Sequence, residues 1–554
     1  MVKRDDAPNA APCGATAPEA RLPGRREVLQ GLALAAAAVP LACAAPTASV
    51  ETAVDAGGFA DASDAAKAEV SCSPVGAGAT VTLGPLSGGV TDHGMRLAVR
   101  TSAAAKVQFE LVAKDAAGNP AGKPLRTACA VTDAAEDFAI VLDIQGLPPA
   151  TAFAVTPWLD EVALSAHAIE AHTFPVAGKP AAFSFCFGSC QKHGDGDKGP
   201  TLGKTYEAMA DLAEKPMFFA QIGDWTYPDY LFSAKAKAAG NGSVGFGGVD
   251  KDGNNYTVFP EELRLSWHRR LDPAYAMRKV LKKVPVAHVW DDHDFAQNNA
   301  HRDVAGKQED RVAAFARYLP TWPLPKSRLG VWQQFTVGHV EFWLVDMRSQ
   351  RTEVAKTVTK TVQPDGTTKL TFAEPPGHTL LGAEQLAWLL DGLKASTATW
   401  KVVFLPVEIN PLFDKIMKLG LQLNVQPAIE AAADGWCGYP TERAQLLDLH
   451  KSGKVKNLVF LTGDAHQASM KERDADCPPV FMAANLDIGQ APVMDLLEAY
   501  GIPGSDIWPF WTQFGDGGGC FGRLTFVTSP AHEVWCDAVD PSGNLLKRMV
   551  VKPQ

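Results

Sequence analysis

The sequence predicts an α/β protein whose main domain is preceded by a small β-sandwich. Residues 78–176 form short runs in which apolar and polar side chains alternate, separated by turn sequences such as AAGNPAG and GLPPAT. That spacing is typical of a sandwich of fibronectin-like or immunoglobulin-like type. In residues 180–554, buried-strand patterns alternate with helical patterns, which indicates a layered α/β domain. A chain of 554 residues is also longer than one hydrophobic core supports.

Residues 1–45 are typical of an export signal. Arg25-Arg26 precede the run GLALAAAAVPLACA, which is too short and too rich in alanine to span a membrane. A twin-arginine pair ahead of a mildly apolar run is typical of the pathway that exports folded proteins, and an accidental pair is the alternative. We therefore expect a protein that works in the periplasm or at the cell envelope.

Cys43 leaves a lipid anchor open. It follows a Leu-Ala pair as in a lipoprotein processing site, although Pro40 fits that pattern poorly, and its small neighbours would serve equally as a simple cleavage site. Residues 46–77 are dominated by Ala, Asp, Ser, Gly and Thr, a composition that predicts a disordered spacer.

The acidic composition argues against one class of partner. The formal net charge is −10, so the chain lacks the basic excess that binds a phosphate backbone, and nucleic acid is not expected as a standing partner. Hydrophobic residues at 46% and charged residues at 21% are ordinary for a globular protein. We found no oligomerisation pattern and expect a monomer.

Eight of the ten cysteines follow the predicted signal segment. An oxidising compartment permits disulfides, but the sequence does not determine their connectivity. The pairings we consider are Cys72 with Cys129, and pairs among Cys437, Cys477, Cys520 and Cys536.

Four apolar runs in the main domain end in residues that can bind metal. They are FSFCFGSC, ending at Cys190; MFFAQIGDWTY, with Asp224 and Tyr227; VPVAHVWDDHD, with Asp291 to Asp294; and NLVFLTGDAH, with Asp464 and His466. Runs this rich in Phe, Val and Ile predict buried strands, and loops past the carboxyl ends of such strands form the crevice of an α/β sheet. Clustered carboxylates are costly to bury without charge compensation. The four loops together predict one metal site.

Further elements complete the α/β pattern. The helices are predicted near 202–212, 309–319, 383–394 and 442–453, and further strands at 340–347, 400–407, 521–528 and 532–551. Residues 354–372 predict a β-hairpin turning at Pro364-Asp365-Gly366, and the Gly-rich segment 232–258 predicts a long surface loop.

Seven motifs in this order resemble the alkaline phosphatase D (PhoD-like) family of metallophosphoesterases. They are FGSCQ, GDWTYPDY, WDDHDFAQNN, VDMRSQR, LGAEQLAWL, DGWCGYPTER and LTGDAH. The preceding β-sandwich and the twin-arginine pair match the family too, and the resemblance covers roughly residues 78–550. It implies a four-layered αββα core that carries Fe3+ and one or two Ca2+ ions.

The resemblance also implies a role for individual residues. It places Cys190, Tyr227 and His466 on iron, Asp224 as the bridging carboxylate, and Asp464 and Asn298 on calcium. Anionic, polarisable thiolate and phenolate suit ferric iron, whereas carboxylate and amide oxygens suit calcium. Asp292 occupies the slot where related phosphoesterases use an Asn ligand, so Asp292 and Asn298 remain alternatives. His293 is the phosphate-contacting imidazole, and His293 and Asp292 are the expected catalytic pair.

Two further residues are candidates for substrate binding. Arg348 could reach a substrate phosphate through its planar fork, although an ion pair near Asp346 is the alternative that we favour. Trp225 takes a position that is often Tyr in the family and could affect substrate stacking. Cys437 stands where the family commonly has Asp, which puts in doubt a hydrogen bond at that position.

The expected activity is hydrolysis of phosphate monoesters, diesters or both. Paired cations clamp a phosphate ester and activate a water or oxo nucleophile, while His293 stabilises the transition state or protonates the leaving group. Scavenging of phosphate outside the cytoplasm follows from the predicted export. The alternatives are a phospholipase D-type phosphodiesterase and, less favoured, a non-catalytic envelope binding protein.

Overall fold

The computed structural model describes residues 72–75, 78–191, 203–227, 267–268, 270–271, 276–296, 298–303, 308–488, 503–512, 519–529 and 532–554. The predicted signal segment with Arg25-Arg26 and Cys43, most of the predicted spacer, and the predicted loop 232–258 lie outside these residues. Within the described part of the chain, no helix combines the length and the apolar character that crossing a membrane requires.

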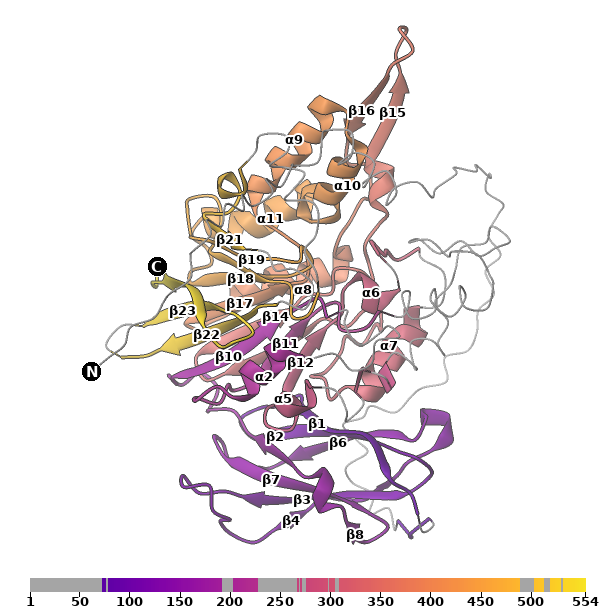
Figure 1. The fold of residues 1–554 in the computed structure, drawn as a ribbon, viewed down its shortest axis with the longest axis vertical. Helices are drawn as coiled ribbons and strands as arrows, with labels where there is room; N and C mark the ends of the chain where they lie inside the picture. The colour runs from indigo at the N-terminus through magenta and orange to yellow at the C-terminus, as the bar shows by residue number, and fades with distance from the viewer. Residues whose placement is uncertain are drawn as a thin grey trace, which may run out of the picture. The chain divides into compact units, whose positions relative to one another are not determined.

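Among the described residues, two large β-sheets pack face to face (Figure 1). The nine-stranded sheet has the order β24 (Leu545–Val551), β23 (Glu533–Val539), β22 (Phe521–Val527), β10 (Phe183–Gly188), β11 (Phe219–Ile222), β12 (Val286–Val289), β1 (Val81–Gly88), β2 (Gly94–Thr101) and β6 (Ala139–Gln145). The seven-stranded sheet has the order β13 (Gln333–Val337), β14 (Val340–Leu344), β17 (Trp400–Leu405), β18 (Leu458–Thr462), β20 (Val480–Ala483), β19 (Ala468–Lys471) and β21 (Phe510–Thr512).

Aromatic side chains fill the space between the two sheets. Phe185 on β10 meets Phe342 on β14 edge to face, with ring centroids 5.4 Å apart, a favourable aromatic geometry. Successive residues of a strand point to opposite faces. Phe218 accordingly contacts Phe342 across the interface, whereas Phe219 turns the other way and contacts Tyr206 of helix α2 (Lys204–Ala210).

The buried strands are parallel where the sequence predicts the site. β10, β11 and β12 pair in parallel within the first sheet, and β14, β17 and β18 pair in parallel within the second. β10, β11, β12 and β18 are buried along their whole length, as their apolar runs predicted. Their carboxyl ends therefore present the following loops at neighbouring positions.

Helices lie alongside both large sheets among the described residues. After α2, they are α5 (Arg278–Leu281), α6 (Asp292–Phe295), α7 (Gln308–Tyr318), α8 (Gly382–Ala395), α9 (Asp414–Leu423), α10 (Gln426–Asp434) and α11 (Pro440–Lys451). Leu389 of α8 and Leu446 of α11 share a hydrophobic core with Val403 of β17. The architecture is a mixed α/β fold with several sheets, and the helices predicted near 202–212, 309–319, 383–394 and 442–453 are confirmed as α2, α7, α8 and α11.

The N-terminal strands are divided between two sheets. A six-stranded sheet holds β4 (Leu125–Arg126), β3 (Lys106–Ala113), β7 (Ala152–Leu159), β8 (Val162–Ala163), β5 (Ala130–Val131) and β9 (Ile169–His172). β1, β2 and β6 instead extend the nine-stranded sheet, because β1 pairs in parallel with β12 at Gly88 and Val286. A Cβ on Gly88 would lie 2.8 Å from the Val286 carbonyl oxygen, so glycine permits this approach. The alternating pattern predicted the strands, and the domain boundary at 176–180 stays a prediction.

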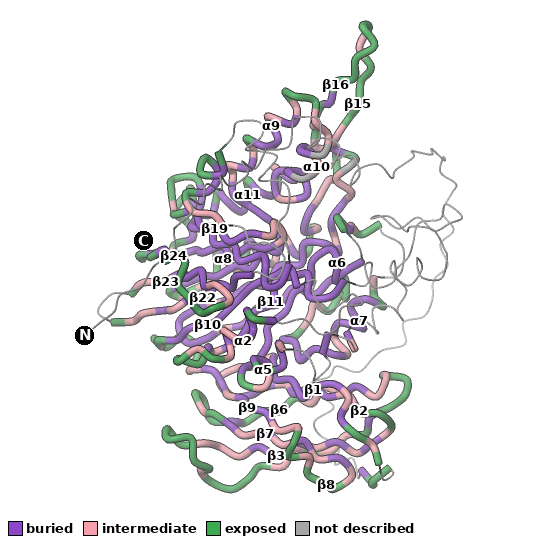
Figure 2. The backbone as a smooth tube through the Cα atoms, viewed as in Figure 1, coloured by how far each residue is buried: buried purple, intermediate pink, exposed green. Residues whose placement is uncertain are grey.

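The predicted hairpin is present, with strands β15 (Val358–Val362) and β16 (Thr368–Phe372) and an exposed tip (Figure 2). The predicted disulfide between Cys72 and Cys129 is also present. The other pairings are wrong: Cys437, Cys477, Cys520 and Cys536 are buried free thiols. Cys536 lies opposite Leu524 on β22, about 13 Å along the strand from Cys520, well beyond the reach of a disulfide.

The ends of β11 and β12 approach closely at Gly223. Its φ is +107°, and a Cβ at this position would lie 2.4 Å from the Cβ of Asp291. Gly223→Ala should therefore combine backbone strain with a steric clash. Gly366→Ala is the matched control, because Gly366 has a φ of +79° but open space around it.

We expect Gly366→Ala to cost about 1–2 kcal/mol from strain and Gly223→Ala to cost roughly 1–3 kcal/mol more from overpacking. Urea-induced unfolding followed by circular dichroism measures both. Equal losses in the two variants would contradict the clash with Asp291.

Candidate metal centre

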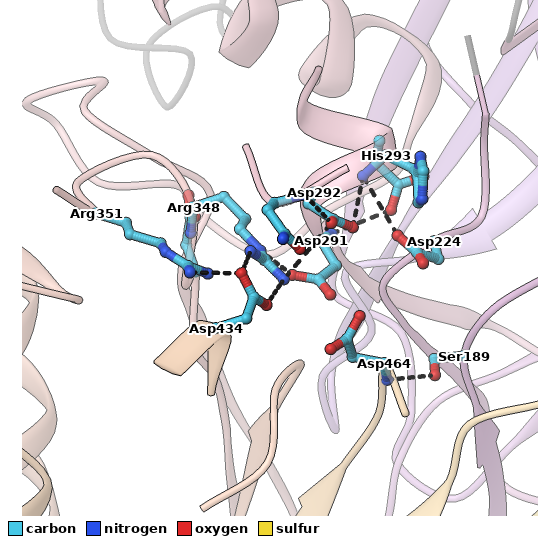
Figure 3. A network of polar contacts seen from close by, with 12 residues as sticks. Ser189, Asp224, Asp291, Asp292, His293, Arg348, Arg351, Asp434 and Asp464 are labelled. Carbon is cyan, nitrogen blue, oxygen red and sulfur yellow. Dashed lines mark hydrogen bonds and ion pairs between the residues drawn. The ribbon is translucent and has the colours of Figure 1, made fainter. Parts of the chain in front are cut away.

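Loops from both large sheets converge on one site. Cys190 follows β10, Asp224 follows β11, Asp292 and His293 open α6 after β12, and Asp464 and His466 follow β18. Backbone hydrogen bonds join these loops. The Cys190 N–H donates to the Gly223 carbonyl (3.2 Å), and the Asp464 N–H donates to Ser189 Oγ (3.3 Å; Figure 3).

Potential metal-binding atoms form three overlapping groups. Within each group, one ligand atom per residue lies within 4.8 Å of the others. The groups are Cys190, Asp224 and His466; Asp224, Asp292 and His293; and Asp224, Asp291, Asp292 and Asp464. Asp224 belongs to all three. Its carboxylate is therefore in the position expected of a bridging ligand between neighbouring cations.

Four residues of this site have an unusual backbone conformation. Cys190, Asp224, Asp464 and His466 have φ values of 60°, 57°, 69° and 49°. A positive φ is uncommon for residues other than glycine, and it persists where the surrounding structure enforces it. The sharp turns that follow the strands thus place these side chains at the expense of local strain.

Tyr227 and His293 lie against the shared carboxylate. The Tyr227 hydroxyl donates to Asp224 Oδ2 at 3.1 Å. The Tyr227 ring packs on the His293 imidazole with centroids 4.4 Å apart. The backbone N–H of His293 donates to Asp292 Oδ1 at 2.8 Å. Because the backbone N–H of His293 also donates to Asp224 Oδ1 at 3.4 Å, Tyr227 and His293 contact one another and both bond the Asp224 carboxylate.

Positive charge would stabilise the ionised forms of the side chains at this site. Burial raises the pKa of the Asp224 carboxyl well above its ordinary value, and the charge on Asp292 raises it further. Burial and the Asp224 carboxylate likewise raise the pKa of the Cys190 thiol. Bound cations would reverse both trends, because they stabilise the ionised ligands. Thiol, phenol, imidazole and carboxylate donors gathered in this way fit metal ions.

Asp292 and Asn298 differ in their surroundings. Asp292 is 1% exposed and belongs to two of the three donor groups, whereas Asn298 is exposed on the loop after α6. The backbone N–H of Asn299 donates to Asp292 Oδ2 (2.6 Å), which fixes the carboxylate. The assignment of Asn298 as a calcium ligand stays a prediction.

The two candidate substrate-binding side chains are fully buried. Trp225 donates from Nε1 to Met277 Sδ (3.3 Å) and meets Trp267 edge to face. Arg348 is paired with Asp291 and Asp434 (Figure 3). The favoured alternative of an ion pair is correct in kind, but its partners are Asp291 and Asp434, and Arg348 gives Asp346 a hydrogen bond only from its backbone N–H. Contact of either side chain with substrate stays a prediction.

Sequence reasoning missed Asp434 and gave Asp291 no role of its own. Asp291 was visible as the first residue of a double Asp after a buried strand. Asp434 ends α10, far along the chain from the other carboxylates, and lies in no apolar run that ends in a ligand. Only its place in the motif DGWCGYPTER marked it.

Comparisons with known proteins agree with this geometry. The family model described as PhoD-like phosphatase matches residues 185–487. Alkaline phosphatase D of Bacillus subtilis (strain 168) is 28% identical over 314 residues, which are 53% of this chain and 48% of that protein. The chain thus matches about half the length of that relative.

Two solved structures share the fold. A structure of PhoD aligns with a TM-score of 0.62 at 19% identity, over 86% of this chain and 94% of that one. A purple acid phosphatase isolated from yellow lupin (Lupinus luteus) seeds aligns with a TM-score of 0.51 at 11% identity, over 84% of this chain and 74% of that one. Because the family model spans more than half of the sequence, the chain belongs to the PhoD-like phosphatase family.

Proposed function

We propose that this protein hydrolyses phosphate monoesters, diesters or both with the help of bound metal ions. The observation that carries the proposal is the position of Asp224, which is shared by three groups of donor atoms at the ends of buried strands. Membership of a phosphatase family and the fold shared with a purple acid phosphatase support hydrolysis of a phosphate ester.

The chemistry of the donors divides the site between two kinds of ion. Cys190, Tyr227 and His466 would hold Fe3+, because anionic sulfur and phenolate oxygen stabilise the ferric state. Asp464 and Asp292 would hold one or two Ca2+ ions, which prefer oxygen ligands. We favour Asp292 over the exposed Asn298, since Asp292 lies within the donor groups.

When bound, the cations supply charge neutralisation and Lewis acidity to the phosphoryl group. The protein's residues fix the geometry around them. Asp224 contributes a ligand atom to all three donor groups. Tyr227 and Asp292 keep His293 in place through the ring contact and the backbone hydrogen bond. His293 then stabilises the phosphoryl oxygens or gives a proton to the leaving alcohol oxygen.

We propose that the reaction takes place outside the cytoplasm, where the enzyme would scavenge phosphate. The Arg25-Arg26 pair ahead of an apolar run supports export, and the Cys72–Cys129 disulfide fits an oxidising compartment. A lipid anchor at Cys43 remains an open alternative. We also propose the family's four-layered core, and an immunoglobulin-like relation for the N-terminal strands.

Metal analysis combined with two model substrates tests the proposed function. The purified protein should contain iron and calcium, and it should hydrolyse p-nitrophenyl phosphate, bis-p-nitrophenyl phosphate or both. A protein that holds neither metal and turns over neither ester would defeat the proposal. Activity on choline-headgroup lipids with little on either model ester would instead favour the phospholipase D-type alternative.

Cys190→Ser should remove iron and the colour that ferric thiolate or phenolate ligation gives. Serine is a hard, weakly acidic donor that does not replace a thiolate on this ion. Cys186→Ser is the matched control, since Cys186 is a buried free thiol on β10, four residues before Cys190. Iron content and the visible spectrum measure the effect. Retention of both in Cys190→Ser would remove Cys190 from the ligand set.

His293→Ala should slow turnover by roughly 10²–10⁴-fold, the usual contribution of a positioned proton donor, while iron and calcium stay bound. His450→Ala serves as the control, because His450 is also buried but bonds the Asp474 carbonyl away from the donor groups. Unchanged kcat in His293→Ala would exclude a chemical role for this imidazole.

A further inference from the structure

We propose that Asp434, Arg348 and Arg351 form a buried clamp that positions Asp291 and Asp292 for the cations. Asp434 and Arg348 are thus positioning residues that act through the carboxylates of the metal centre. The inference rests on the proposed function and adds to it the part of the protein that sets the calcium side of the site.

Arg348 joins three carboxylates and is 0% exposed. Its Nε donates to Asp291 Oδ1. Its Nη1 and Nη2 donate to the two oxygens of Asp434 at 3.2 and 3.1 Å. Nη2 also lies 3.9 Å from Asp292 Oδ2. The planar guanidinium thus fixes the relative orientation of these carboxylates, which the point charge of a lysine would not do.

Asp434 is also fixed by a second arginine, Arg351. Arg351 Nη2 donates to Asp434 Oδ1 at 2.5 Å, and Arg351 Nε donates to the Tyr439 hydroxyl at 2.9 Å. The Tyr439 hydroxyl in turn donates to the Thr352 carbonyl at 2.6 Å. The side chains of Asp434, Arg351 and Tyr439 are all buried. The clamp is therefore anchored in the interior, and Asp434 has little freedom to release Arg348.

The clamp leaves one oxygen of Asp291 available. Arg348 occupies Oδ1, whereas Oδ2 is buried and has no hydrogen-bond partner. Asp291 also contributes a ligand atom to the donor group with Asp224, Asp292 and Asp464. Figure 3 shows Asp291 between Arg348 and Asp464. A buried carboxylate oxygen without a partner is costly unless a cation meets it, so the clamp presents this oxygen to the metal centre.

The burial of Arg348 favours a positioning role over contact with substrate. A substrate phosphate needs an accessible guanidinium, whereas the Arg348 side chain is 0% exposed and its fork is already engaged by Asp434. Loss of Asp434 would remove two of the three side-chain hydrogen bonds that Arg348 makes to carboxylates and leave it free to shift toward Asp292. The carboxylates would then lose the orientation that the cations require.

Asp434→Asn tests the clamp, because it keeps the shape of the side chain and removes the charge. Calcium titration of chelator-treated protein by calorimetry should show Ca2+ affinity weakened roughly 10- to 100-fold, the usual effect of changing a residue that orients a metal ligand. At saturating Ca2+ the hydrolysis rate should recover, with KM for p-nitrophenyl phosphate within about twofold of the unmodified protein.

Asp414→Asn is the matched control. Asp414 pairs with the buried Arg443 as Asp434 pairs with Arg348, but it lies outside the donor groups. Its loss should leave Ca2+ affinity unchanged. Arg348→Lys provides a second variant that retains the positive charge, and it should weaken Ca2+ binding in the same direction even if Asp434→Asn does not fold.

Three results would overturn the inference. The first is a Ca2+ affinity within about threefold of the unmodified protein in a folded Asp434→Asn or Arg348→Lys variant. The second is an increase in KM with Ca2+ affinity unchanged, and the third is an equal loss of Ca2+ affinity in Asp414→Asn. If the unmodified protein hydrolyses neither ester and binds no Ca2+, the proposed function itself fails. If the unmodified protein does both and the variants bind Ca2+ normally, only the clamp fails.

Discussion

The crowding of carboxylates at the ends of three buried strands, β11, β12 and β18, and of helix α10 is the constraint on which the rest of the site depends. Asp224, Asp291, Asp292, Asp294 and Asp434 are buried, and Asp464 is half-buried beside them. Two buried guanidinium groups, those of Arg348 and Arg351, lie among them. Six carboxylates against two cations cannot all be ionised in a low-dielectric interior without further positive charge. Bound metal ions supply that charge in the function proposed here.

The backbone is shaped to hold this arrangement. Asp294 accepts hydrogen bonds from the backbone N–H groups of Trp225 and Thr226, so the turn after β11 is fastened to the start of α6. The Asp464 turn is fastened to Ser189 in the same way. These links come from strands far apart in the sequence. They explain how left-handed conformations at Cys190, Asp224 and Asp464 persist.

The sequence predicted the parts of the fold that depend on local pattern. Apolar runs predicted β10, β11, β12 and β18. The polar residues after β10, β11 and β12 meet because these parallel strands share an edge, and those after β18 join them from the second sheet. The extension of the core sheet by β1, β2 and β6 was beyond such reasoning, since alternation predicts a strand but not its neighbour. Asp434 was missed for a similar reason: its partners are Arg348 and Arg351, more than eighty residues earlier in the chain.

Charge compensation at this site has two sources with different consequences. The arginines are fixed, fully buried and committed to Asp291 and Asp434, so they orient carboxylates on the interior side. Asp464 and His466, by contrast, are half-buried and follow β18 of the other large sheet. In the proposed function, a phosphate ester meets carboxylates there, while Arg348 and Arg351 are already paired with those carboxylates. Its negative charge would then be met by bound cations. Catalysis would depend on metal occupancy, and the buried arginines would contribute through the geometry of that occupancy.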